Sequence, residues 1–131
     1  MAAFQHVALN CRDLEKSRAF YEKHFGFKLA RIFQDGTPNK FYMLRLADAR
    51  LELFSAKGDG EAFEQTVGFT HLAFEVPDID AAIKALNDDG YQTEPIIDCS
   101  HVVEGMRICF FPDPDGNRLE LMEGYQDQFP A

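Results

Sequence analysis

The stretch FPDPDGNRLELM, residues 111–122, contains a tight turn followed by a strand. Pro114 presets φ for the turn, and Gly116 tolerates positive φ. Hydrophobic residues run into this turn and alternating residues run out of it, which predicts a β-hairpin. On the outgoing strand Glu120 stands among apolar neighbours, where an unpaired carboxylate is costly. Glu120 is therefore a candidate functional residue.

The tetrapeptide RLEL occurs at 50–53 and again at 118–121, and it belongs to a longer internal repeat. Pairs of identical residues recur at nearly the same interval along the chain: His6 and His71, Asp13 and Asp78, Gly26 and Gly90, and Glu52 and Glu120. A histidine on each first strand and a glutamate on each last strand indicate a duplicated module.

The first module, about residues 4–55, predicts the element order βαβββ. Strands are expected at 4–11, 27–33, 40–46 and 50–55, and a helix at 14–25 that Asp13 caps and Gly26 ends. A linker is expected at about 56–68, where glycine and charged residues cluster.

The second module, about residues 69–123, repeats this order. Strands are expected at 69–76, 91–97, 106–111 and 118–123, and a helix from Ile79 to Gly90 with Asp78 or Asp80 as its cap. The tail from Gly124 to Ala131 is expected to be loosely held. Together the patterns predict a single α+β domain, residues 1–131, of two tandem βαβββ modules that form a cupped, barrel-like mixed sheet.

Composition limits the classes of partner. The chain has 131 residues and a formal net charge of −9, spread along its length, which argues against nucleic acid or an anionic membrane surface. Its cysteines, Cys11, Cys99 and Cys109, show no CxxC spacing, so reduced thiols in a cytoplasmic protein are expected. The start of the chain shows neither a secretory signal nor a membrane-spanning run.

If each module forms half of the cup, the repeated polar side chains converge at its centre: His6, Glu52, His71 and Glu120. Two imidazoles and two carboxylates suit a borderline divalent ion such as Zn, Ni, Co, Fe or Mn. On an octahedral ion, four protein ligands leave two positions for water or a bidentate substrate. His24 and His101 are interpreted as ordinary histidines outside this set.

The chain resembles the vicinal oxygen chelate superfamily, which includes glyoxalase I, methylmalonyl-CoA epimerase, extradiol dioxygenases and bleomycin- and fosfomycin-resistance proteins. The resemblance covers nearly the whole chain, and the segments that carry it are FQHVAL at 4–9, FYEKHFGF at 20–27, FTHLAFEV at 69–76 and DPDGNRLEL at 113–121. It implies the fold of that superfamily.

The order His, Glu, His, Glu is similar to that of glyoxalase I, or lactoylglutathione lyase. Epimerases typically carry glutamine at the position of Glu52, dioxygenases and fosfomycin transferases use His, His and Glu only, and bleomycin-binding proteins generally lack the ligands. The resemblance implies a divalent metal, with Ni, Zn or Co ahead of Fe or Mn. It also implies that Glu120 is the catalytic base and that Glu52 is its counterpart in the other module.

The function implied is that of a metal-dependent lyase or isomerase. It would act on a hemithioacetal or similar α-hydroxycarbonyl by proton abstraction and stabilisation of the enediolate, as a cytoplasmic homodimer. A non-catalytic small-molecule binding protein and an oxygenase are the alternatives. Bacterial glyoxalase I has an arginine at the position of Asn10 and an asparagine near Ala56, so the identity of the thiol stays open. Arginines that could replace the missing one are Arg45, Arg107 and Arg118.

Overall fold

A computed structural model describes residues 1–130 of the chain, which form two compact units. The N-terminal unit contains residues 6–70 and the end of the chain from Asp127, and the C-terminal unit contains Met1–Gln5 and His71–Gln126. Ala131, the last residue of the predicted tail, lies outside the described residues. None of the helices in residues 1–130 has the length and apolar character that a membrane span requires.

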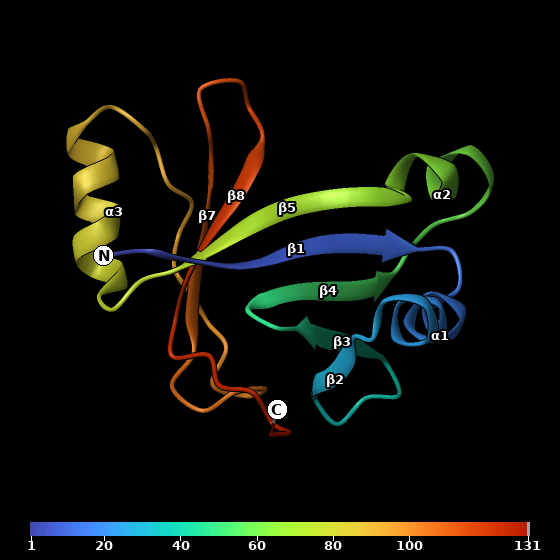
Figure 1. The fold of residues 1–131 in the computed structure, drawn as a ribbon. Coiled ribbons are helices and arrows are strands. Elements are labelled where there is room, and N and C mark those ends of the chain that lie inside the picture. Colours follow the sequence, from blue (N-terminus) through green and yellow to red (C-terminus); the bar gives the residue numbers. More distant parts are fainter. Residues whose placement is uncertain (131) are drawn as a thin grey trace. The chain divides into compact units, whose positions relative to one another are not determined.

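The N-terminal unit has the predicted order βαβββ, followed by one further helix. Its elements are β1 (Ala3–Cys11), whose first residues count with the other unit, α1 (Leu14–Phe25), β2 (Lys28–Gln34), β3 (Lys40–Leu46), β4 (Ala49–Ser55) and α2 (Gly60–Thr66). The strands lie in the order β2-β3-β4-β1, and β1 runs parallel to β4 while the other pairs are antiparallel. Figure 1 shows α1 against β3 and β4.

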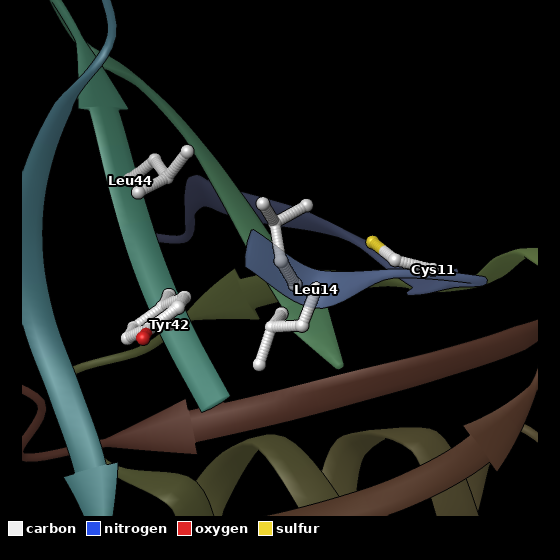
Figure 2. Packing of buried hydrophobic residues seen from close by; sticks show 5 residues of the cluster. Cys11, Leu14, Tyr42 and Leu44 are labelled. Atoms are coloured by element: carbon white, nitrogen blue, oxygen red, sulfur yellow. The ribbon is translucent and has the colours of Figure 1, made fainter. Parts of the chain in front are cut away.

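Helix α1 forms where its local signals predict. The Asp13 side chain accepts a hydrogen bond from the backbone N–H of Lys16 at 3.0 Å, and Gly26 ends the helix with φ of 79°. Leu14 packs into an apolar cluster beneath the helix. That cluster consists of Cys11, Leu14, Tyr42, Leu44 and Leu53 (Figure 2). The cluster fixes one face of β3 and β4, so the alternate residues of these strands face the other way.

The C-terminal unit repeats the arrangement with shorter elements. They are β5 (Gly68–Glu75), whose first three residues belong to the N-terminal unit, α3 (Ile79–Asp88), β6 (Ile97–Asp98), β7 (Arg107–Pro112) and β8 (Arg118–Glu123). The strands lie in the order β5-β8-β7-β6, with β5 parallel to β8 and the other pairs antiparallel. Its core consists of Val76, Ile79, Cys109, Phe111 and Leu121.

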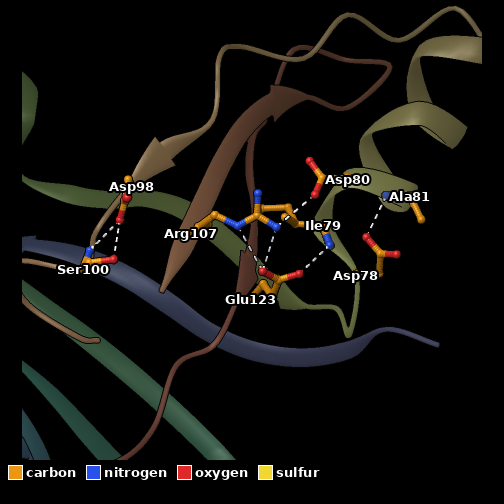
Figure 3. Close-up of polar contacts among 8 residues, drawn as sticks. All are labelled: Asp78, Ile79, Asp80, Ala81, Asp98, Ser100, Arg107 and Glu123. Atoms are coloured by element: carbon orange, nitrogen blue, oxygen red, sulfur yellow. Dashed lines mark hydrogen bonds and ion pairs between the residues drawn. The ribbon is translucent and has the colours of Figure 1, made fainter. Parts of the chain in front are cut away.

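The start of α3 resolves the choice between two capping residues. Asp78 is the cap, because its carboxylate accepts from the backbone N–H of Ala81 at 3.1 Å. Asp80 instead binds the Arg107 guanidinium at 3.0 Å. Glu123 accepts from Arg107 and from the backbone N–H of Ile79, so it ties the end of β8 to the helix (Figure 3).

The predicted hairpin turn between β7 and β8 is confirmed. Gly116 has a φ of 85°, and its N–H donates to the Asp113 carbonyl at 3.0 Å. The Asp113 carboxylate accepts from the backbone N–H groups of Asp115 and Asn117 and from the Asn117 side-chain amide, each at 2.8 Å. These hydrogen bonds lower the pKa of Asp113 below its ordinary value.

The linker expected at 56–68 contains a short helix, α2. Two predictions of local structure were wrong. Of the strand expected at 91–97 only Ile97 lies in a strand, β6, where it pairs with Ile108 of β7. Pro95 supplies no N–H to a ladder, which explains the loss of that strand. The tail is held, because the N–H groups of Gln128 and Phe129 donate to the Ala30 carbonyl at 2.8 and 3.0 Å. The other predicted strands agree with the structure to within about one residue at each end.

Candidate functional site

The N-terminal unit places His6 and Glu52 together. Strands β1 and β4 are parallel neighbours in which Ala8 is the register partner of Glu52, so His6 lies one pleat away on the same face. His6 Nε2 lies 3.2 Å from Glu52 Oε1. Both residues are buried, His6 completely and Glu52 to all but 7% of its surface.

The C-terminal unit places His71 and Glu120 together in the same way. Ala73 on β5 is the register partner of Glu120 on β8, which matches the pairing of Ala8 with Glu52. His71 Nε2 lies 3.2 Å from Glu120 Oε1, and their side chains are 8% and 7% exposed. The repeat seen in the sequence therefore extends to strand register and side-chain geometry.

Each pair brings an imidazole nitrogen and a carboxylate oxygen together in a buried environment. A buried carboxylate is stable only with hydrogen bonds, an opposite charge or a metal ion. Imidazole nitrogen and carboxylate oxygen are the donor atoms that borderline divalent ions accept. The donor atoms of each pair are thus of the kind that a divalent ion accepts, and each module carries one such pair.

Phe110 lies beside the C-terminal pair, and Arg118 packs on Phe110. Phe110 on β7 is the register partner of Glu120, and its ring meets the His71 ring edge-on with centroids 5.4 Å apart. The Arg118 guanidinium lies 4.0 Å above the Phe110 ring and binds Glu94 at 2.9 Å. Phe110 was not predicted from the sequence, although alternation along β7 places it on the face of Glu120.

Other residues considered from the sequence have structural partners. Asn10 donates through its side-chain amide to the carbonyl of Thr66 at 2.9 Å and so anchors the end of α2 to β1. Arg107 is bound to Asp80 and Glu123 at the start of α3. Cys109 is fully buried, and burial raises the pKa of its thiol, which fits a packing role.

Two βαβββ units, each with a buried His–Glu pair on parallel strands, define the class of protein. The Glyoxalase/Bleomycin resistance protein/Dioxygenase superfamily model matches residues 3–121. The chain therefore belongs to this superfamily, as the resemblance predicted. Its members are generally enzymes that bind small-molecule substrates, typically with a divalent metal.

Three known proteins illustrate the range of relatives. The uncharacterized protein YwkD of Bacillus subtilis is 34% identical over 127 residues, which cover 94% of this chain and 98% of YwkD. Lactoylglutathione lyase of Haemophilus influenzae is 29% identical, with 90% of each chain covered. The crystal structure of methylmalonyl-CoA epimerase from Mycobacterium tuberculosis aligns with a TM-score of 0.72 and 22% identity, over 93% of this chain and 87% of the epimerase. The structural likeness confirms the predicted fold class.

Proposed function

We propose that this protein is a divalent-metal-dependent lyase or isomerase similar to glyoxalase I, acting on a hemithioacetal or a similar α-hydroxycarbonyl compound. The observation that supports it is the repeated His–Glu pair, with the same strand register and the same Nε2 to Oε1 distance in both modules. Glu52 distinguishes this ligand set from one with two histidines and a single glutamate. The similarity to lactoylglutathione lyase over 90% of the chain agrees with it.

The residues that would hold the ion are His6, Glu52, His71 and Glu120. Each supplies one nitrogen or oxygen donor of the kind that Ni, Zn, Co, Fe and Mn accept. The bound ion would supply positive charge beside the two vicinal oxygens of the substrate and so acidify the C–H bond between them.

Glu120 is the proposed base, and Glu52 is its counterpart in the other module. The Glu120 carboxylate takes the proton from the carbon that carries the hydroxyl and returns it to the neighbouring carbon, so the net reaction is an isomerisation without an external oxidant. Burial of Glu120 to all but 5% of its surface keeps bulk water from exchanging with that proton during transfer.

A reconstitution assay tests this proposal. Metal content is measured on the purified protein, and apoprotein is then supplied with Ni, Zn, Co, Fe or Mn and assayed with methylglyoxal and a panel of thiols that includes glutathione. Glu120→Gln should lower kcat at least about a hundredfold, and Glu52→Gln should lower it and weaken metal binding. Glu104→Gln, at an exposed position, is the matched control.

The same assay separates the alternatives. Absence of thioester formation with every metal and thiol, together with tight binding of an aromatic or drug-like ligand, would identify a binding protein instead. Iron-dependent oxygen consumption would identify an oxygenase. Either outcome would overturn the proposal.

We further propose that the protein works as a cytoplasmic homodimer without nucleic acid or membrane partners. Superfamily members often act as dimers, and closed two-fold pairing is the commonest arrangement of soluble oligomers. The mass in solution, measured by light scattering on the eluting peak of a sizing column, should be twice that of one chain. A monomeric mass at assay concentration would contradict it.

A further inference from the structure

Two arginines of the N-terminal unit bind one carboxylate from the end of the chain. Arg45 on β3 and Arg50 on β4 are register partners, so their side chains lie side by side on one face of the sheet. Arg50 contacts Asp127 through Nε to Oδ1 and Nη2 to Oδ2, both at 3.2 Å, and Arg45 Nη1 donates to Oδ2 as well. These contacts join two guanidinium groups to one carboxylate.

Arg45 has hydrogen-bonding capacity that Asp127 does not use. Its side chain is only 11% exposed, and Arg45 Nη2 is buried with no hydrogen-bond partner among residues 1–130. A buried guanidinium N–H without an acceptor is costly. The oxyanion of a bound ligand would supply that acceptor.

The arginine pair lies next to Glu52. Arg50 precedes Glu52 by two residues on β4, so both side chains point to the same face and are about 7 Å apart along the strand. In the other direction along the same face Phe54 stacks on Phe41, with ring centroids 4.6 Å apart. Phe41 stacks in turn on Phe33, at 4.5 Å. Along this face of the sheet, the two arginines therefore lie on one side of Glu52 and the stacked phenylalanines lie on the other.

We infer that Arg45 and Arg50 form an oxyanion subsite, next to Glu52, for the substrate of the proposed reaction, a conclusion that rests on the proposed function. The substrate class is a compound with a carboxylate or phosphate on one side of its reacting carbons and an apolar or planar group on the other. The oxyanion accepts from Arg45 Nη2 and takes over the forked contact with Arg50. When no anion is bound, Asp127 binds the two guanidinium groups. When the anion binds, the Asp127 side chain, which is 20% exposed, turns outward.

The tail can stay in place during this exchange. The backbone N–H groups of Gln128 and Phe129 bind the Ala30 carbonyl, and the Gln128 side chain accepts from the N–H of Ile32 at 3.0 Å. These contacts do not involve the Asp127 carboxylate, so a change of its rotamer is sufficient.

The test follows the Nε–H resonances of Arg45 and Arg50 by NMR while inorganic phosphate, or in a second series malonate, is added to the full-length protein. Reading these resonances separates binding at the arginines from binding of the anion to a metal ion elsewhere. Both resonances should shift with saturation. The series with the lower dissociation constant identifies phosphate or carboxylate as the preferred group.

Variants distinguish an anion-binding subsite from an arginine pair that only holds the C-terminal tail through Asp127. Asp127→Asn removes the competing carboxylate and should tighten anion binding about fivefold, whereas Arg50→Gln should weaken it at least about tenfold. Arg50→Lys, which keeps the charge and loses the fork, should fall between them. The matched control is the exposed pair Arg12 and Glu64, where Arg12→Gln and Glu64→Gln should leave the titration unchanged.

Unchanged arginine resonances, or equal anion affinity in the wild type, Asp127→Asn and Arg50→Gln, would overturn the inference whatever the catalytic assay gives. Anion binding that follows the expected order in a protein without turnover would support the subsite and refute the proposed reaction. Should Asp127→Asn fail to fold, the order of wild type, Arg50→Lys and Arg50→Gln decides the question alone.

Discussion

Gly124, the residue after β8, should be the glycine of the C-terminal unit that tolerates substitution least. Its φ is 85°, and a Cβ built on it would lie 2.5 Å from the carbonyl oxygen of Gly105 and 3.0 Å from the carbonyl carbon. Both atoms belong to the backbone, so no rotation of a side chain can relieve the contact. Gly124→Ala therefore forces the backbone of one of two segments to move.

The expected loss of stability in Gly124→Ala has two parts. Placing an alanine at positive φ costs about 1 to 2 kcal/mol, and forcing apart packed atoms costs about 1 to 3 kcal/mol more. Gly124→Ala should thus lower the free energy of unfolding by about 2 to 5 kcal/mol, a large part of the 5 to 15 kcal/mol typical of domains. Gly90→Ala is the matched control, because Gly90 has a φ of 91° and an added Cβ would meet nothing within 4 Å.

Urea unfolding followed by circular dichroism measures both variants against the wild type, with stability taken from the midpoint at a common m-value. We expect Gly90→Ala to show the conformational cost alone and Gly124→Ala to exceed it by at least about 1 kcal/mol. Equal losses in the two variants would mean that the close approach of Gly124 to Gly105 does not restrain the fold, and the reasoning would fail.

Three other properties can be tested by simple changes. Asp78→Ala removes the cap of α3 and should cost about 1 kcal/mol in urea unfolding; no loss would show that the cap is dispensable. Hydrogen bonds from Asn117 lower the pKa of Asp113 in the folded state. The Asp113 carboxylate therefore stabilises the fold above the ordinary carboxyl pKa, and this stabilisation is lost as pH falls below about 4. The wild type should therefore lose more stability than Asp113→Asn on acidification, and parallel curves would contradict this. Burial raises the pKa of the Cys11 and Cys109 thiols, so a disulfide reagent at pH 8 should label them about a hundredfold slower in the folded protein than in urea, and fast labelling would refute it.

Elements defined by local signals could be predicted from the sequence. Asp13 and Gly26 lie at opposite ends of α1 and perform the capping roles that their residue types favour. The turn at Gly116 follows in the same way from a proline and a glycine two positions apart, Pro114 and Gly116. The His–Glu pairs could be predicted because alternation and the repeat together fix both the face and the strand of each histidine and glutamate.

Features that depend on distant partners could not be predicted. The tail resembles a loose terminus until its contacts with Ala30, on a strand far back in the sequence, are known. Asp127 looks like a surface carboxylate for the same reason, and its pairing with Arg45 and Arg50 gives no periodic signal. Helix α2 was missed because Gly58 and Gly60 are typical of a linker, and none of its residues is buried.

The two His–Glu pairs depend on a register that is the same in both modules. Each glutamate is opposite an alanine on the parallel strand, Ala8 for Glu52 and Ala73 for Glu120, and both alanines are fully buried. In a parallel pair such partners point to the same face, so the residue opposite a glutamate is the one best placed to cover its carboxylate. An alanine has only a methyl group with which to do so. The alanine at both positions therefore leaves each carboxylate open to the neighbouring histidine and to a bound ligand. A larger side chain there would cover the carboxylate.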